Sequence, residues 1–196
     1  GDQFYAGMAS LTAVTEEPKY QWWRMECQTG DYRYRGAEIG IYDTSYAESG
    51  GAYTLTNTNK VKVYVTGVSA YGSIFDKTFI TDTDEFGTTA FDGILTSTST
   101  NRVVIDENAN GYVIFDFEFE NPIQAKHVVF TDDYAAELDK SFQTINVYYS
   151  NQYASDSSSW TLYGTFDNSS TTKKNGSFLK ILTHDGSDFI LDTVTD

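Results

Sequence analysis

The sequence predicts an all-β protein: an antiparallel β-sandwich with a C-terminal β-hairpin and little helix. Two observations lead to this fold class. Aromatic residues make up 16% of the 196 residues, with 15 Tyr and 13 Phe but only two prolines, and this composition favours strands. In several segments, apolar residues also alternate with polar ones, and a period of two is typical of half-buried strands.

Four internal segments have this strand pattern. Apolar residues occupy alternate positions in 61–65, in 113–119 and in 145–149. Residues 127–131 form a shorter apolar run, which is followed by two aspartates. We therefore expect a core built mainly from strands.

A closing hairpin is expected near the C-terminus. Two apolar-rich runs, 177–183 and 188–194, flank His184-Asp185-Gly186-Ser187. An Asp-Gly pair provides the positive φ that a tight hairpin turn needs. Only residues 134–140 are rich in helix-forming residues, and one or two turns is the limit there.

The chain length suits one all-β domain with additions. We divide the chain into an N-terminal arm over 1–19, a β-sandwich over 20–166, a linker over 167–176 and a C-terminal β-hairpin over 177–196. The arm shows no sustained periodicity, and the linker is polar and rich in turn-forming residues.

The charge of the chain restricts its partners. Thirteen basic and 28 acidic residues give a formal net charge of −15, which repels phosphate backbones, so we expect no nucleic-acid partner.

No stretch approaches the roughly 18 apolar residues of a membrane span. The single cysteine, Cys27, lies in an apolar run, where a buried thiol is the ordinary outcome.

Five short signatures occur in order along the chain: Trp23-Arg24-Met25, Ala37-Glu38-Ile39, Ala90-Phe91-Asp92-Gly93, Tyr148-Tyr149-Ser150-Asn151 and Trp160-Thr161-Leu162. Together they resemble the discoidin, or coagulation factor 5/8 type C, family of galactose-binding-like β-sandwiches, over roughly residues 20 to 166. The Trp-Arg segment precedes the Phe-Asp-Gly segment here. That order is similar to permuted bacterial and bacteriophage versions of the family. The resemblance implies a discoidin-like jelly roll.

The resemblance also implies strand pairs. We expect the Trp22–Met25 strand to pair with 37–41 after a loop over 28–36. The family's tyrosine-serine-asparagine hairpin corresponds to 145–151 followed by 160–163, with an expanded loop between them. Separately, the turn-rich stretch 106–111 predicts a hairpin between 103–105 and 112–119.

A structural Ca²⁺ is implied at the Phe-Asp-Gly loop. In the family this loop binds calcium through an Asp, a nearby Thr and backbone carbonyls, which corresponds to Asp92 and Thr96 here, with Glu38 as the distant carboxylate. Oxygen ligands suit this hard cation. The alternative is a metal-free tight turn that uses the same Asp and Gly. The acidic loop 106–111 has Phe117 where a calcium loop needs its bidentate Glu.

Candidate ligand-binding residues are aromatic or basic residues in expected loops. Sugars stack their apolar faces on aromatic rings and need fixed hydrogen-bonding groups. Local enrichment in Arg and Tyr is also what protein interfaces use, and any one tyrosine can be an ordinary surface residue. The candidates are Tyr32, Arg33, Tyr34, Arg35, Tyr134 and Tyr153.

The function expected from these features is non-catalytic recognition of a glycan or another cell-surface ligand. The chain has two histidines, no GxSxG elbow and no HExxH helix, so we do not expect an enzyme. The resemblance implies an extracellular, cell-surface or virion setting, such as a phage tail, baseplate or capsid fibre. The alternative is a structural virion or assembly protein that contacts protein neighbours or forms a homo-oligomer.

Overall fold

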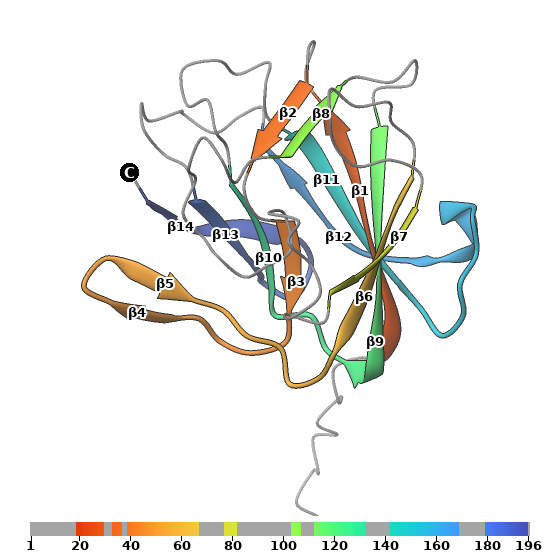
Figure 1. Cartoon of the computed structure of the whole chain (residues 1–196), viewed down its shortest axis with the longest axis horizontal. Helices are drawn as coiled ribbons and strands as arrows, with labels where there is room; N and C mark the ends of the chain where they lie inside the picture. Colours follow the sequence, from red (N-terminus) through yellow and green to blue (C-terminus); the bar gives the residue numbers. More distant parts are fainter. Residues whose placement is uncertain are drawn as a thin grey trace, which may run out of the picture.

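The computed structural model describes residues 19–29, 33–36, 39–66, 77–81, 103–106, 112–131, 142–168 and 179–195. Their strands form two larger antiparallel sheets and two short ribbons (Figure 1). The all-β sandwich expected from the sequence is confirmed. In this part of the chain, no helix is long and apolar enough to cross a membrane.

The larger sheet has the strand order β12-β11-β1-β9-β6-β7. Its central strand, β1, pairs with β11 on one side and with β9 on the other. Side chains alternate between its two faces, so Trp23, Met25 and Cys27 are buried while Trp22 and Glu26 are only partly buried. Its strands are β1 (Tyr20–Thr29), β6 (Val61–Thr66), β7 (Lys77–Thr81), β9 (Tyr112–Ile123), β11 (Phe142–Ser150) and β12 (Thr161–Asp167).

The smaller sheet has the order β14-β13-β10-β3. The predicted C-terminal hairpin supplies two of its strands, and Gly186 in the turn has φ 110°, as its Asp-Gly pair predicts. The hairpin is thus part of the second sheet. The strands are β3 (Ile39–Tyr42), β10 (His127–Thr131), β13 (Leu179–His184) and β14 (Phe189–Thr195).

The core lies between the two sheets. The larger sheet contributes residues such as Trp23, Phe115 and Phe117, and the smaller one residues such as Phe130 and Leu182. All of them are at most 2% exposed. Burying each side chain of this size stabilises the fold by roughly 1.5–3 kcal/mol relative to exposure. Cys27 is buried in the same core, as expected.

A second, smaller cluster covers the outer face of the smaller sheet. Tyr42, Val129 and Ile181 point to this face and pack with Leu55. Tyr46 and Tyr53, with ring centroids 5.8 Å apart, lie against the cluster. The four residues of β3 are therefore all buried, because packed side chains cover both faces of the sheet there.

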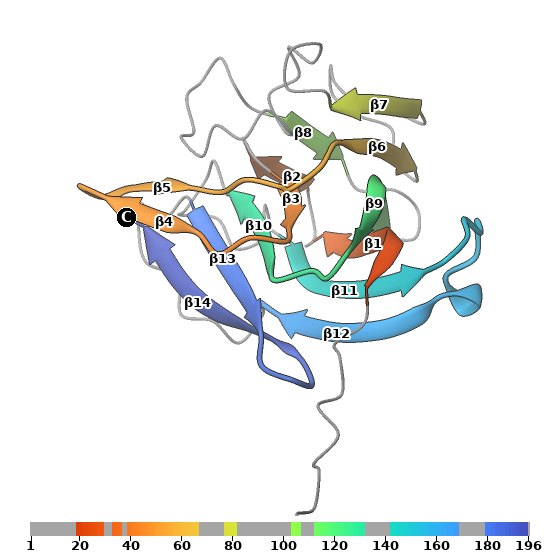
Figure 2. The same cartoon turned by 90° about the horizontal axis from the view of Figure 1, so that it is seen from below.

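The two ribbons are short. β2 (Arg33–Gly36) pairs with β8 (Val103–Asp106), and β4 (Ala47–Ser49) pairs with β5 (Ala52–Thr54). In both Figure 1 and Figure 2 the β4–β5 ribbon projects from one side of the molecule, while the connection between β11 and β12 projects from the opposite side.

Two expected strand pairs are wrong. The segment 37–41 was expected beside the Trp22–Met25 strand, but β3 pairs with β10 in the smaller sheet. The reason is that β11 and β9 occupy both hydrogen-bonding edges of β1. The hairpin expected between 103–105 and 112–119 is also absent from the described strands: β8 pairs with β2, whereas β9 lies between β1 and β6.

The sequence also predicted a loop, a helical turn, an N-terminal arm and a linker, and the structure describes only part of these segments. The loop expected over 28–36 contains strand at both ends, because β1 extends to Thr29 and β2 covers Arg33–Gly36. The helical turn at 134–140, the arm apart from Lys19 and most of the linker lie outside the described residues. The first two linker residues are described: Asp167 ends β12, and Asn168 is buried and donates a hydrogen bond to the Phe142 carbonyl.

Candidate functional site

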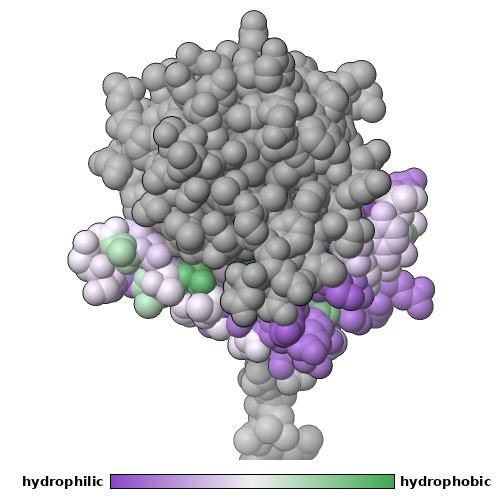
Figure 3. Space-filling model, in the orientation of Figure 1, coloured by the Kyte–Doolittle hydropathy of each residue, from purple (hydrophilic) through white to green (hydrophobic). Residues whose placement is uncertain are grey.

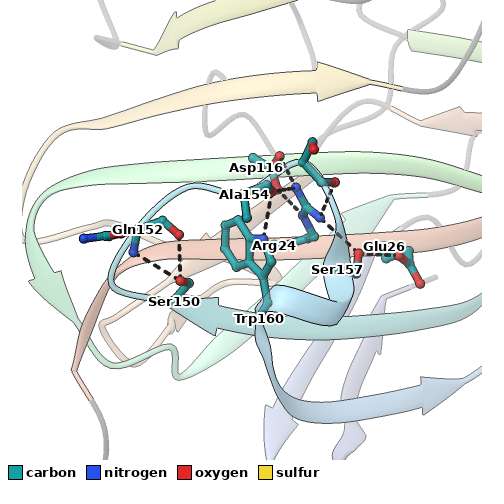
Figure 4. Close-up of polar contacts among 9 residues, drawn as sticks. Arg24, Glu26, Asp116, Ser150, Gln152, Ala154, Ser157 and Trp160 are labelled. Carbon is teal, nitrogen blue, oxygen red and sulfur yellow. Dashed lines mark hydrogen bonds and ion pairs between the residues drawn. The ribbon is translucent and has the colours of Figure 1, made fainter.

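The connection between β11 and β12, residues 151–160, folds over the outer face of the larger sheet and is held there by Arg24. We call it the β11–β12 loop. The Arg24 side chain comes from β1, points away from the core and is nevertheless only 1% exposed. It donates to both carboxylate oxygens of Asp116 on β9, at 2.7 and 2.9 Å (Figure 4).

Three more hydrogen bonds join Arg24 to the loop. Its guanidinium donates to the carbonyl of Ala154 at 2.9 Å, to the carbonyl of Ser155 at 3.1 Å and to the Ser157 hydroxyl at 3.0 Å. A guanidinium has five N–H donors, so these contacts engage every one. A buried charge is tolerated when it is paired and fully hydrogen-bonded in this way.

Trp160 covers the guanidinium. The central carbon of the guanidinium, Cζ of Arg24, lies 4.4 Å from the centroid of the Trp160 indole ring, within cation–π distance. The indole nitrogen donates to the Ala154 carbonyl at 2.9 Å, which gives the loop a further contact. Burial raises the pKa of the Asp116 carboxyl, and its hydrogen bonds and charge attraction with Arg24 oppose that rise.

The loop also contains a short 3₁₀ turn, Ser157–Ser159. The Asp156 carboxylate caps this turn by accepting from the backbone N–H of Ser158 at 2.8 Å. The Ser157 hydroxyl in turn donates to Glu26 of β1 at 2.7 Å. Strand β1 therefore holds the loop through two side chains, Arg24 and Glu26, two residues apart on one face.

A groove of about 410 Å³ opens between the start of β1 and this loop. We call it the β11–β12 groove. Its aromatic lining is Tyr20, Tyr149 and Tyr153, and the Tyr20 and Tyr149 rings stack with centroids 4.0 Å apart. The rest of its lining is Ala154 and a polar set without formal charge: Ser150, Asn151, Gln152, Ser159 and Thr161.

An aromatic cluster lies next to the groove on the outer face of the sheet. Trp22 of β1 is at its centre, with ring centroids 5.6 Å from Tyr64 of β6, 5.3 Å from Tyr153 and 6.4 Å from Trp160. Tyr153 is 49% exposed and lines the groove as well, so it joins the two features.

Tyr64 is fixed in this cluster by an acid. Its hydroxyl donates to Glu118 of β9 at 2.8 Å. Burial together with this hydrogen bond and the Glu118 charge raises the pKa of Tyr64 to about 12. The hydroxyl therefore keeps its proton at physiological pH, and the hydrogen bond to Glu118 orients the ring.

The residues expected to bind ligand are not all brought together. Of the six, the structure describes the surroundings of one side chain, that of Tyr153, which lies in the groove. Arg33, Tyr34 and Arg35 belong to β2, which pairs with β8 in a separate ribbon and is not a strand of the larger sheet. Tyr32 and Tyr134 lie outside the described residues.

The expected calcium ligands Glu38, Asp92 and Thr96 also lie outside the described residues. Within the described ranges, no group of three or more His, Cys, Asp or Glu side chains is placed to hold a metal ion.

Three functional candidates were missed from the sequence: Tyr20, Trp22 and Tyr64. A signal for two of them was present. Tyr64 alternates with the buried Val63, and Trp22 precedes the buried Trp23, so period two places both on the outer face. A large aromatic at an outward strand position is a candidate contact residue. Nothing in the local pattern indicated that Tyr20 would stack on Tyr149.

Comparison of the chain with protein-family models, with curated proteins and with solved structures finds no match in any of the three. The geometry of the loop, the groove and the aromatic cluster therefore carries the functional conclusion.

Proposed function

We propose that the protein is a non-catalytic binding module that recognises carbohydrate, or another cell-surface ligand, through the β11–β12 groove and the adjoining aromatic cluster. One observation carries this proposal. Tyr153 is 49% exposed, its ring centroid lies 5.3 Å from that of Trp22, and it also lines a groove with polar walls. Sugar rings need both an aromatic platform and hydrogen-bonding groups beside it.

The polar wall has suitable chemistry. Asn151 and Gln152 are exposed, and their side-chain amides contain both donors and acceptors, as sugar hydroxyls require. Ser150 positions this wall, because its hydroxyl donates to the Gln152 carbonyl at 2.6 Å and accepts from the Gln152 N–H at 3.1 Å. A pyranose on the Tyr153 ring could then direct its hydroxyls to this wall.

The loop is also held in shape without a ligand. Arg24 and Glu26 of β1 make five contacts with it, and the Trp160 indole adds a hydrogen bond within the loop, so little conformational freedom remains to be lost on binding. Ordering a flexible loop would cost about 0.5–1.5 kcal/mol for each immobilised side chain. Preorganisation favours a binding role for a loop this large.

The motif resemblance supports the same proposal at the level of fold and setting. The β11–β12 hairpin joins Tyr148-Tyr149-Ser150-Asn151 to Trp160-Thr161-Leu162, two of the signatures that resemble discoidin-like modules. We therefore propose a discoidin-like module in an extracellular, cell-surface or virion setting, with a phage tail, baseplate or capsid fibre as the preferred context.

The test is binding to a glycan array, followed by calorimetry with the best ligand. Tyr153→Ala should weaken binding at least about tenfold, because ring truncation removes a hot-spot contact. Ile190→Ala is the matched control: Ile190 is also 49% exposed but lies on β14 of the other sheet. If Tyr153→Ala and Ile190→Ala bind as tightly as the wild type, the proposed site is wrong.

The second candidate function, assembly, is favoured by the β4–β5 ribbon. Its strands have three residues each, and every residue from Ala47 to Thr54 except Tyr53 is exposed. Two-stranded ribbons are marginally stable alone and present unpaired edges. Figure 3 shows this projection as pale and green surface at the left, opposite the more hydrophilic purple surface at the right.

For this candidate we propose a neighbour, either a second copy or another virion protein, that pairs with the ribbon. Sedimentation should then show self-association of the wild type that Ala52→Lys reduces and Leu162→Lys, on the exposed edge strand β12, does not. A monomer at every concentration would reject the homo-oligomer.

We also propose a structural Ca²⁺ held by Asp92, Thr96 and Glu38. Its support is the oxygen-rich Phe-Asp-Gly segment of the motif resemblance. Chelation with EDTA should lower the melting temperature of the wild type, and Asp92→Ala should abolish that difference. A wild-type melting curve that EDTA leaves unchanged rejects the ion.

A further inference from the structure

We infer that the β11–β12 groove accepts an uncharged glycan and discriminates against sialylated, sulfated or uronic-acid glycans. This inference rests on the proposed function, because it names the class of carbohydrate that the same site takes. Three features carry it: the lining of the groove, the hydrogen bonding of Arg24 and the distribution of acids around the loop.

In the part of the chain that the structure describes, no cation lines the groove. Among the described residues, the side chains that line the groove are tyrosines, amides, hydroxyls and one alanine. A carboxylate or sulfate is bound most strongly by charge-assisted hydrogen bonds from Arg or Lys, which are about twice as strong as neutral ones. Amides and hydroxyls match neutral sugar hydroxyls instead, since both can donate and accept.

The arginine that holds the loop is already fully engaged. Arg24 directs all five donors to Asp116, Ala154, Ser155 and Ser157, and the Trp160 ring covers it at 4.4 Å. To bind an anionic sugar, Arg24 would have to give up either a hydrogen bond to the buried Asp116 carboxylate or one of the contacts that hold the loop in place. Arg24 therefore shapes the loop and does not provide a site for an anion.

Among the described charged groups around the site, and apart from the Arg24–Asp116 pair, the acids outnumber the lysines. Glu26 accepts from Ser157, Asp156 caps the 3₁₀ turn, and Glu118 accepts from Tyr64 beside Trp22. Two lysines are also nearby. Lys62 lies directly opposite Glu118 in the sheet, and the exposed Lys19 precedes Tyr20; neither lines the groove.

The whole chain adds to this local field. Its formal net charge is −15, and a field of one sign repels ligands of that sign. Salt screens such repulsion over a length of about 8–10 Å at physiological ionic strength. A neutral ligand is indifferent to both effects, so the salt dependence of binding reports on ligand charge.

The experiment uses matched pairs of glycans on one array: neutral oligosaccharides and the same cores with sialic acid or sulfate added. The full chain should bind the neutral members at least about tenfold more tightly at low salt, because the acids around the loop repel an anionic sugar and the described lining offers it no cation. Adding salt should reduce the difference in affinity between neutral and charged glycans, because it improves binding of the charged members only. Gln152→Lys, which puts a cation into the groove wall, should also reduce this difference in affinity.

Two results would overturn the inference, and they differ in what they say about the proposed function. Tighter binding of charged members that Tyr153→Ala removes and that salt weakens would show a carbohydrate site with the opposite charge preference. The proposed function would then stand. Absence of any Tyr153-dependent glycan binding would remove both the inference and the function on which it rests.

Discussion

Removing the Arg24 side chain is the sharpest test of how the β11–β12 loop is held. Arg24→Ala deletes a bidentate ion pair and leaves Asp116, itself 1% exposed, as a buried carboxylate without a partner. Breaking a buried pair from one side costs about 3–5 kcal/mol. For a domain of this size that corresponds to a melting temperature lowered by about 10 °C.

The stability lost in Arg24→Ala should increase with pH. Burial raises the pKa of Asp116, and in the variant no arginine opposes that rise. The folded variant therefore binds a proton more readily than the unfolded chain does. Its free energy of unfolding is higher below the unfolded pKa and falls as pH rises through the folded pKa. The difference in the free energy of unfolding between the wild type and Arg24→Ala should therefore be larger at pH 7 than at pH 4.

Urea denaturation at both pH values measures these effects. The matched control is Arg24→Ala/Asp116→Ala, which removes both charges and should recover part of the lost stability and abolish the added pH dependence. This double variant still lacks the three hydrogen bonds to Ala154, Ser155 and Ser157, so it should bind ligand less tightly than the wild type. A loss below about 1 kcal/mol for Arg24→Ala, typical of an exposed pair, would refute the reasoning.

Two further predictions concern the turn of the C-terminal hairpin and the buried thiol. Gly186→Ala should lower the free energy of unfolding by about 1–3 kcal/mol, because φ is 110° there and a Cβ strains that backbone; an unchanged urea midpoint would contradict this. Cys27 is 0% exposed and burial raises the pKa of its thiol, so a thiol reagent should modify it only after denaturation. Rapid labelling in native buffer would disprove that protection.

The strands that were predicted correctly share one property: each has a periodic pattern within a few residues. The alternation in 61–65 and 113–119 reports which side of a strand is apolar, and burial of Val63, Phe115 and Phe117 follows it. The C-terminal hairpin was readable for a similar reason, since Asp185-Gly186 determines the turn locally.

Strand partners were harder to predict because they depend on which hydrogen-bonding edges other strands leave open. Ile39–Tyr42 follows β1 closely in sequence, yet β1 has β9 and β11 as neighbours, and both come much later in the chain. The apolar character of β3 is satisfied equally well in the smaller sheet, where both of its faces are covered. Nothing within a local window distinguishes these two arrangements.

By itself, the sequence determined the fold class, the inward face of the main strands and the unusual length of the connection between Tyr149 and Trp160. Tertiary structure decided the site. Trp22, Tyr64 and Tyr153 come from three distant segments, and only the pairing of β1 with β9 and β11, and of β9 with β6, places their rings together. Periodicity shows which way a side chain points, but contact between segments depends on sheet order, which arises from long-range pairing.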